Sequence, residues 1–114
     1  MRFSDEVKEA IIKRSGGRCE ICGVRASQYH LHHRRPRGMG GSKQVESGSA
    51  ANGILIHPHC HDKIESNRST AMENGWLVRQ GHDPAYTPLL RRGQWVTLTE
   101  DGSLFPWQED AAGQ

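Results

Sequence analysis

The sequence predicts a small α+β domain. Apolar residues recur at helical spacing near the N-terminus, and short runs rich in β-branched and aromatic residues, bounded by glycine and proline, follow further along the chain. A length of 114 residues fits one domain. Hydrophobic residues make up 34% of the chain and aromatic residues 6%, which is lean for a core that must stabilise the domain alone. Small domains of this kind usually need disulfides or a metal ion.

Residues 4–15 form the first expected element, an α-helix. Ser4 can cap its start, and acidic side chains follow in the first turn, where the helix dipole favours them. Its apolar positions have helical spacing: Val7, Ala10 and Ile11. Gly16 and Gly17 end the helix.

The middle of the chain alternates short strands with loops. Residues 28–33 have the composition of a strand, whereas residues 38–53 are rich in Gly, Ser and Asn and predict a long loop. Residues 54–56 predict a buried strand. Pro58 suits the first position of a helix, which we expect to run to about Gly75.

Two C-terminal stretches, 75–81 and 94–105, predict further strands, and the second forms a short hairpin that turns at Asp101 and Gly102. Their large apolar side chains are expected as core and packing residues: Trp76, Trp95, Leu98, Leu104 and Phe105. The chain is thus expected to consist of an N-terminal helix (1–18), a central unit (19–75), a C-terminal β extension (76–107) and a disordered tail (108–114).

Net charge is only +2, but it is unevenly distributed. Residues 19–68 contain seven Lys or Arg against four Asp or Glu, whereas residues 98–114 contain four acids and no base. A basic middle suits a polyanionic partner, although ordinary solvated faces explain the same charges. The longest aliphatic run, residues 54–56, is far too short to span a membrane, and the N-terminus lacks the apolar region of a secretory signal. We therefore expect a cytoplasmic protein.

The three cysteines and seven histidines favour metal binding over disulfides, because three cysteines would leave one unpaired. Cys19 and Cys22 are separated by two residues, and so are His57 and Cys60. Two such pairs supply the four ligands of a tetrahedral structural zinc site. His59 is the rival of His57 but breaks the matched spacing. The alternative is a free thiol pair with Cys60 buried as a small apolar residue.

A second set of polar residues remains: His32, His33, Asn52 and His61. Phosphodiester hydrolysis needs an activated nucleophile and stabilisation of charge on the phosphate and the leaving oxygen. Histidine is suited to be the base, and a divalent ion can provide the stabilisation. Adjacent strand residues point to opposite faces, so one imidazole of the pair can bind metal while its neighbour stays available. His30 shares a face with His32, but an exposed role is expected for it. His82 has no partner in view.

The order C-x-x-C, then H-H-x-x-P with a Gly-rich loop, then N and a final H just past the last zinc ligand resembles the HNH endonuclease motif. The resemblance covers roughly residues 19–68. It implies a ββα-metal (His-Me finger) fold and a DNA endonuclease or nickase of low sequence specificity that leaves a 5′-phosphate and a 3′-hydroxyl. Small standalone proteins of this kind occur in bacteria and tailed phages, some beside the DNA-packaging terminase. A terminase is therefore a possible partner, and the bacterial host cell the expected location.

Carried over by position, the resemblance makes His33 the general base and Asn52 the residue that orients it and braces the loop. His32 and His61 become ligands of the catalytic divalent ion, with Mg²⁺, Mn²⁺ or another transition metal as candidates. Two departures stand out. His57 replaces the usual cysteine of the second zinc pair, and Glu65 occupies the position of a frequent third histidine ligand. Glu65 as a ligand would shift preference towards harder ions, although it is equally expected as a solvated helix residue.

The arginines after His33 are expected to bind the DNA backbone, with weaker contacts from the following helix: Arg34, Arg35, Arg37, Lys63 and Arg68. A solvated flexible loop is the alternative for the arginines. A second hypothesis for the whole chain is an inactive zinc-finger-like module that binds nucleic acid or protein. The sequence leaves oligomeric state and DNA preference open.

Overall fold

The computed structural model describes residues 3–36 and 48–107. The expected tail at 108–114 lies outside these residues. The elements in chain order are α1 (Asp5–Ser15), β1 (His30–His33), the short 3-10 helix η2 (Ala50–Asn52), β2 (Gly53–Ile56), α2 (Pro58–Ser66), α3 (Arg68–Glu73), the 3-10 helix η3 (Pro84–Tyr86), β3 (Leu89–Arg91), β4 (Gln94–Leu98) and β5 (Leu104–Pro106). No helix of this described part is long and apolar enough to cross a membrane.

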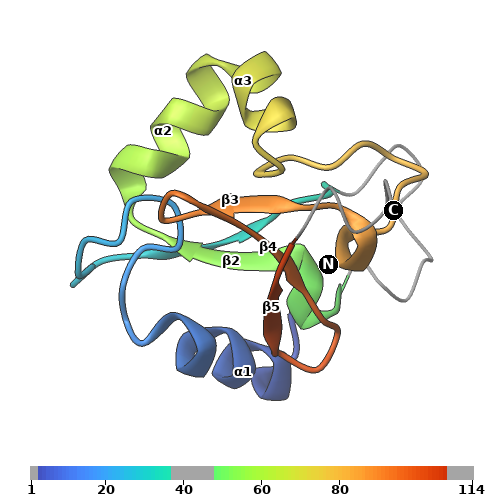
Figure 1. Cartoon of the computed structure of the whole chain (residues 1–114). Helices are drawn as coiled ribbons and strands as arrows, with labels where there is room; N and C mark the ends of the chain where they lie inside the picture. Colours follow the sequence, from blue (N-terminus) through green and yellow to red (C-terminus); the bar gives the residue numbers. More distant parts are fainter. Residues whose placement is uncertain (1–2, 37–47, 108–114) are drawn as a thin grey trace.

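Strands β1 and β2 form an antiparallel hairpin whose register pairs His30 with Ile56 and His33 with Gly53. Helix α1 lies on one side of this hairpin and α2 with α3 on the other (Figure 1). This places two strands and a following helix together as expected for a ββα arrangement. The predicted α+β class is confirmed.

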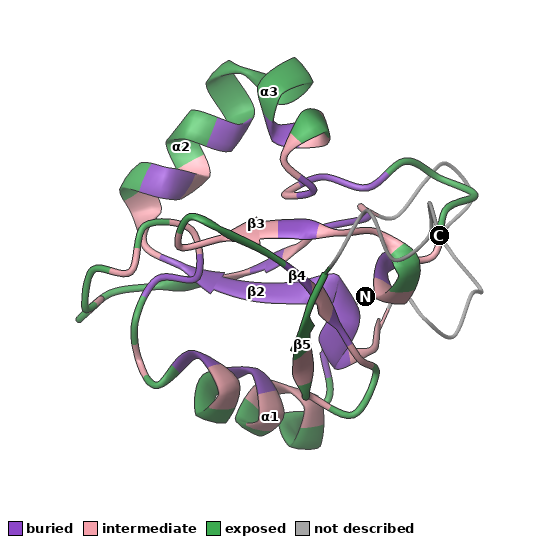
Figure 2. Ribbon diagram, in the orientation of Figure 1, coloured by how far each residue is buried: buried purple, intermediate pink, exposed green. Residues whose placement is uncertain are grey.

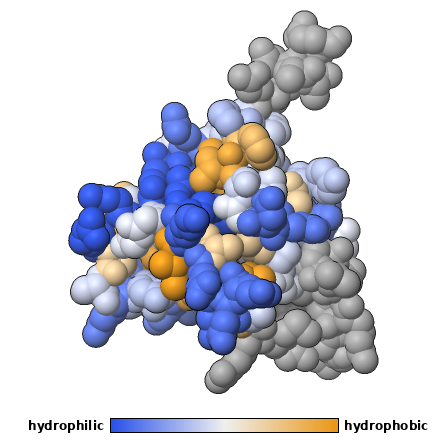
Figure 3. All heavy atoms as spheres, turned by 90° about the horizontal axis from the view of Figure 1, so that it is seen from below, coloured by the Kyte–Doolittle hydropathy of each residue, from blue (hydrophilic) through white to orange (hydrophobic). Residues whose placement is uncertain are grey.

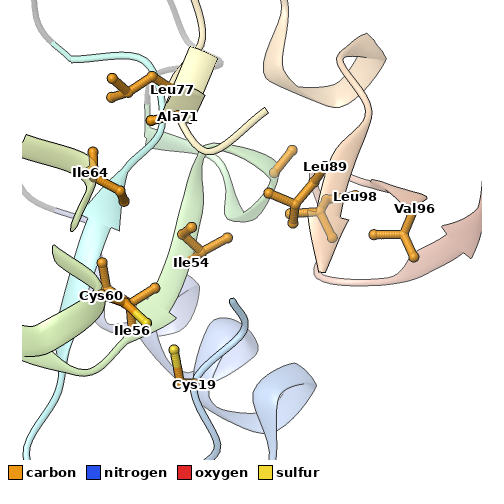
Figure 4. Close-up of a cluster of buried hydrophobic side chains, with 11 residues drawn as sticks. Cys19, Ile54, Ile56, Cys60, Ile64, Ala71, Leu77, Leu89, Val96 and Leu98 are labelled. Atoms are coloured by element: carbon orange, nitrogen blue, oxygen red, sulfur yellow. The ribbon is translucent and has the colours of Figure 1, made fainter. Parts of the chain in front are cut away.

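Strand β2 is buried on both faces, which explains its continuous apolar sequence (Figure 2). Leu55 packs in a small cluster with Phe3 and Ile11 under α1. Ile54 and Ile56 belong to the larger core, shown in Figure 4, which also contains Cys19 and Cys60 and residues of α2, α3 and the C-terminal strands. The hairpin therefore separates two apolar layers, and the cysteines border the larger one.

Helix α1 forms as predicted, because Ser4 accepts a hydrogen bond from the Val7 amide and Gly16 adopts the left-handed conformation at the other end. The single helix expected from Pro58 to about Gly75 is instead two helices. Asn67 has φ −145° and ψ 76°, which interrupts the first helix. Its side chain then accepts a hydrogen bond from the Thr70 amide and so caps the second.

The strand predicted at 75–81 is wrong. The amides of Trp76 and Leu77 both donate to the Ala71 carbonyl at the end of α3, and the Val78 amide donates to the Arg34 carbonyl. These bonds fix the segment as an irregular connection that leads from α3 towards η3 and lies against Arg34, the residue after β1. Its apolar composition reflects the burial of Leu77 and Val78.

The C-terminal extension is a three-stranded antiparallel sheet with the order β3-β4-β5. The predicted hairpin around Asp101 and Gly102 joins β4 to β5, whereas β3 was not expected. Leu98 is fully buried, but Trp95 and Phe105 are 38% and 56% exposed, so their predicted core role is wrong. The face seen in Figure 3, on which α1 lies, is mainly hydrophilic with hydrophobic residues in separate patches.

Candidate metal centre and polar site

The four predicted zinc ligands converge. Cys19, Cys22, His57 and Cys60 offer ligand atoms that all lie within 4.8 Å of one another, and within the described residues they form the one such group. The Cys22 Sγ is 3.3 Å from the His57 Nε2, and the Cys60 Sγ is 3.9 Å from the same nitrogen. Three thiolates and one imidazole suit tetrahedral zinc, so the donor set fits a structural zinc ion.

The local backbone explains this convergence. Gly23, with φ +82°, closes the first pair by donating its amide to the Cys19 carbonyl. The second pair lies at the start of α2, where His57 precedes the helix and Cys60 faces the core one turn later. His59 is exposed and its ring stacks on that of His57, with centroids 5.9 Å apart, which is consistent with His57 as the ligand.

The electrostatics of Cys19 and Cys60 differ. Burial raises the pKa of Cys19, but hydrogen bonds from the backbone, first of all that of Cys22, outweigh it and lower the pKa overall. Burial raises the pKa of the Cys60 thiol to about 12, and the neighbouring Cys19 adds to the effect. A zinc ion at this place would favour the thiolate form of both cysteines, because its positive charge counteracts the raised pKa of Cys60 and adds to the lowering at Cys19.

The two adjacent histidines of β1 point to opposite faces, as their positions on a strand predict. The His32 ring lies on the α2 side, with its centroid 5.7 Å from that of His61. The His33 ring lies on the α1 side, where it stacks on Phe3 with centroids 3.9 Å apart and planes 6° apart. Gly53, paired with His33 across the hairpin, makes this possible, because a Cβ there would lie 2.7 Å from the Phe3 Cζ.

His32 is oriented by a backbone carbonyl. Its Nε2 is 2.9 Å from the Trp76 oxygen, and because a carbonyl can only accept, Nε2 must carry the proton. Nδ1 is then the nitrogen with a free lone pair. Burial lowers the pKa of His32 to about 4, with smaller contributions from neighbouring cations, so the ring is neutral at pH 7. A neutral imidazole held through its other nitrogen is typical of a metal ligand.

His61, in the first turn of α2, meets His30 as well as His32. The Nδ1 atoms of His30 and His61 are 3.2 Å apart, and their ring planes are nearly perpendicular. On the other side of its ring, the His61 Nε2 is 3.8 Å from a Glu65 carboxylate oxygen. His30 was expected to be merely exposed. The His-x-His alternation of β1 was the signal that could have drawn attention to it.

Asn52 is fully buried and braces the chain after His33. Its Oδ1 accepts from the Arg35 amide at 2.7 Å, its Nδ2 donates to the Arg35 carbonyl at 3.2 Å, and its own carbonyl accepts from the Arg34 amide at 2.7 Å. Asn52 therefore fixes the two residues that follow the predicted base, Arg34 through its backbone carbonyl and Arg35 through its side chain.

Arg34 and Arg35 do not form the expected phosphate-binding surface. Both are buried, at 0% and 1% exposure. The Arg34 guanidinium donates to four backbone carbonyls: those of Ala51, Gly75, Pro84 and Thr87. Arg35 donates to the His82 carbonyl. Burial lowers the pKa of Arg34 without discharging it at neutral pH, and the carbonyl oxygens solvate its charge. These arginines connect the central unit to the C-terminal extension.

Arg37 lies outside the described residues. Lys63 and Arg68 are exposed on and just after α2, and Arg68 is 3.4 Å from Glu65. Of the predicted phosphate-binding residues that the structure describes, Lys63 and Arg68 are therefore the two that are exposed.

In a comparison with known proteins, the chain matches one family model. Residues 19–67 match the family model described as HNH endonuclease. No curated protein matches the chain. The matched segment begins at Cys19 and includes both zinc pairs, Asn52 and every histidine of the polar site, so it indicates a nuclease-type function with DNA as its implied substrate.

Proposed function

Because residues 19–67 belong to the HNH endonuclease family, we propose that the chain is a metal-dependent DNA endonuclease that nicks the phosphodiester backbone, leaving a 5′-phosphate and a 3′-hydroxyl. The observation that supports this most is the arrangement of His32 and His33 on opposite faces of β1, with His61 of α2 facing the first. An accessory role beside a phage DNA-packaging terminase remains an expectation from the family resemblance.

In the proposed reaction, His33 takes the proton from the attacking water. Asn52 contributes by fixing the backbone directly after this histidine, and Phe3 by supporting one face of its ring. His32 and His61 would hold a divalent ion, which supplies charge neutralisation at the phosphate and at the leaving oxygen. The carbonyl of Trp76 keeps His32 in the tautomer that leaves Nδ1 available.

DNA binding is proposed on the exposed helical side, with Lys63 and Arg68 contacting phosphates. Exposed lysine and arginine contacts are lost as salt rises, so affinity should be salt-sensitive. Glu65, predicted as a third metal ligand, lies beside His61 and stays part of the proposed site.

Supercoiled plasmid incubated with a panel of divalent ions tests the function. We expect open-circular product with Mg²⁺, Mn²⁺ or a transition ion and none with a chelator that strips the added ion at a concentration leaving the zinc in place. Gel-shift binding is measured on the same samples. Binding without product at every ion would instead favour the inactive zinc-finger-like module.

A further inference from the structure

We propose that His30 is a third ligand of the catalytic divalent ion, and that Glu65 orients His61 instead of binding the ion itself. This rests on the proposed function only in supposing an ion beside His61. The family position for a third ligand, four residues after His61, is occupied here by Glu65. In the structure, the nitrogen atom that lies next to His61 is instead the Nδ1 of His30, on β1.

The first argument is the short distance between the rings of His30 and His61, which lets both bind one ion. The Nδ1 atoms of His30 and His61 face each other at 3.2 Å. Two imidazole nitrogens bound to one ion at about 2.0–2.2 Å are roughly 3–3.5 Å apart. The ring centroids of His61 lie 5.0 Å from His30 and 5.7 Å from His32, so one ring of α2 is flanked by both histidines of the strand face. His30 is exposed, which leaves room for the ion and for a phosphate.

The second argument concerns the Nε2 atoms of His32 and His61, whose neighbours determine which ring nitrogen is left to bind the ion. The Trp76 carbonyl holds the Nε2 proton of His32, which leaves Nδ1 for the ion. If His61 also binds through the Nδ1 that faces His30, its Nε2 must carry the proton, and this atom is 3.8 Å from the Glu65 carboxylate. A carboxylate beside the distal nitrogen of a ligating histidine fixes its orientation and raises its basicity. Glu65 therefore suits this supporting position, with Arg68 on its outer side.

The ligand set has a consequence for metal choice. Glu65 as a ligand would favour hard ions such as Mg²⁺ or Mn²⁺, whereas three imidazoles favour later transition ions such as Co²⁺ or Ni²⁺. In the described part of the chain, the one group of side chains close enough to bind a common metal ion is the Cys and His tetrad. The ring nitrogens of His30, His32 and His61 are therefore not yet close enough together to bind one ion. Because His30 and His61 already lie 3.2 Å apart, binding would draw His32 towards this pair.

Calorimetric titration of the zinc-loaded full chain with Co²⁺ and with Mg²⁺ tests the proposal, with the visible absorption of Co²⁺ as a second readout. The variants are His30→Ala, Glu65→Gln and, as a matched control, His82→Ala, which removes an exposed loop histidine. We expect one Co²⁺ site beyond the tetrad and a preference for Co²⁺ over Mg²⁺. Its affinity should fall by more than about tenfold in His30→Ala, by about tenfold in Glu65→Gln and not at all in His82→Ala.

Unchanged Co²⁺ affinity and spectrum in a folded His30→Ala would overturn the assignment, and so would the absence of a second site in the wild-type chain. A larger loss of Co²⁺ affinity in Glu65→Gln than in His30→Ala would indicate that Glu65 binds the ion, and it would also contradict the assignment of His30. Plasmid nicking is read separately. A chain that binds Co²⁺ through His30 but cuts no DNA would support the ligand set while refuting the nuclease function.

Discussion

At the residue scale, Arg34 differs most from its prediction. Its position directly after the predicted base predicts phosphate binding, whereas its contacts in the fold give it a structural role. It follows the predicted base directly, yet its guanidinium is fully buried among carbonyls from η2, η3 and the end of α3. These acceptors are 17 to 53 residues away along the chain. No local pattern around Arg34 could therefore have predicted that it is buried.

Replacing Arg34 by Met should unfold the connection between the central unit and the extension. The change leaves up to four buried carbonyls without their donor, each costing about 1–3 kcal/mol. We expect the free energy of unfolding to fall by at least about 3 kcal/mol, measured by urea denaturation. The control Arg79→Met removes an exposed arginine and should change stability by less than about 0.5 kcal/mol. Equal stability of the two variants would contradict this role.

At the element scale, the first cysteine pair depends on a buried ion pair. Glu20 is fully buried and accepts from Arg14 of α1 at 2.7 and 2.8 Å and from Arg91 of β3 at 2.9 Å. It also accepts from the Leu55 amide at 3.0 Å. Burial raises the pKa of Glu20, but the hydrogen bond and charge of Arg14 outweigh it and lower the pKa overall. One carboxylate thus joins α1, β2 and β3 beside Cys19.

Glu20→Gln should therefore destabilise the domain strongly. Removing the carboxylate leaves the buried Arg14 guanidinium and the partly buried one of Arg91 without their counter-charge, and breaking a buried pair typically costs about 3–5 kcal/mol. Thermal unfolding with zinc bound measures the effect. Glu100→Gln, at an exposed position after β4, is the matched control and should leave the melting temperature almost unchanged. A melt of Glu20→Gln that overlays the wild type would show that the ion pair contributes no stability.

The elements also show what a sequence can predict. Helix α1, strands β1 and β2, and the β4–β5 hairpin have local caps, alternation or turn residues that specify them. The break at Asn67 and the irregular course of Trp76 to Val78 depend on hydrogen bonds to Ala71 and Arg34 that only the assembled fold provides. Trp95 and Phe105 were predicted to be buried because they are large and aromatic. The face of the sheet that carries Val96 and Leu98 is the buried one, whereas both aromatic side chains are exposed.

At the scale of the whole molecule, the zinc tetrad joins two segments about forty residues apart and borders the larger core. A tetrad could be predicted because matched spacings are local signals, whereas the contact between His30 and His61 needed the hairpin and α2 to be placed relative to each other. A zinc ion held by this tetrad would account for the lean composition, since metal-binding free energy is folding free energy in such domains.

Removal of zinc should accordingly unfold the domain. Cys60→Ser deletes one ligand, and we expect it to lose the cooperative thermal transition that the wild type shows when zinc is bound. Excess chelator should lower the melting temperature of the wild type, and added Zn²⁺ should restore it. His59→Ala, which alters the exposed neighbour of His57, should retain both zinc and the transition. A wild-type melt that does not respond to the chelator would be inconsistent with a structural zinc.

We propose His33 as the base that activates water at a DNA-cutting site. The rate of plasmid nicking by His33→Ala, compared with wild type at equal zinc content and at a temperature where both are folded by circular dichroism, tests it most directly. Loss of a general base typically lowers the rate by about 10²–10⁴-fold, so we predict nicking reduced at least a hundredfold while DNA binding persists. Nicking by His33→Ala at the wild-type rate would show that His33 is not the base.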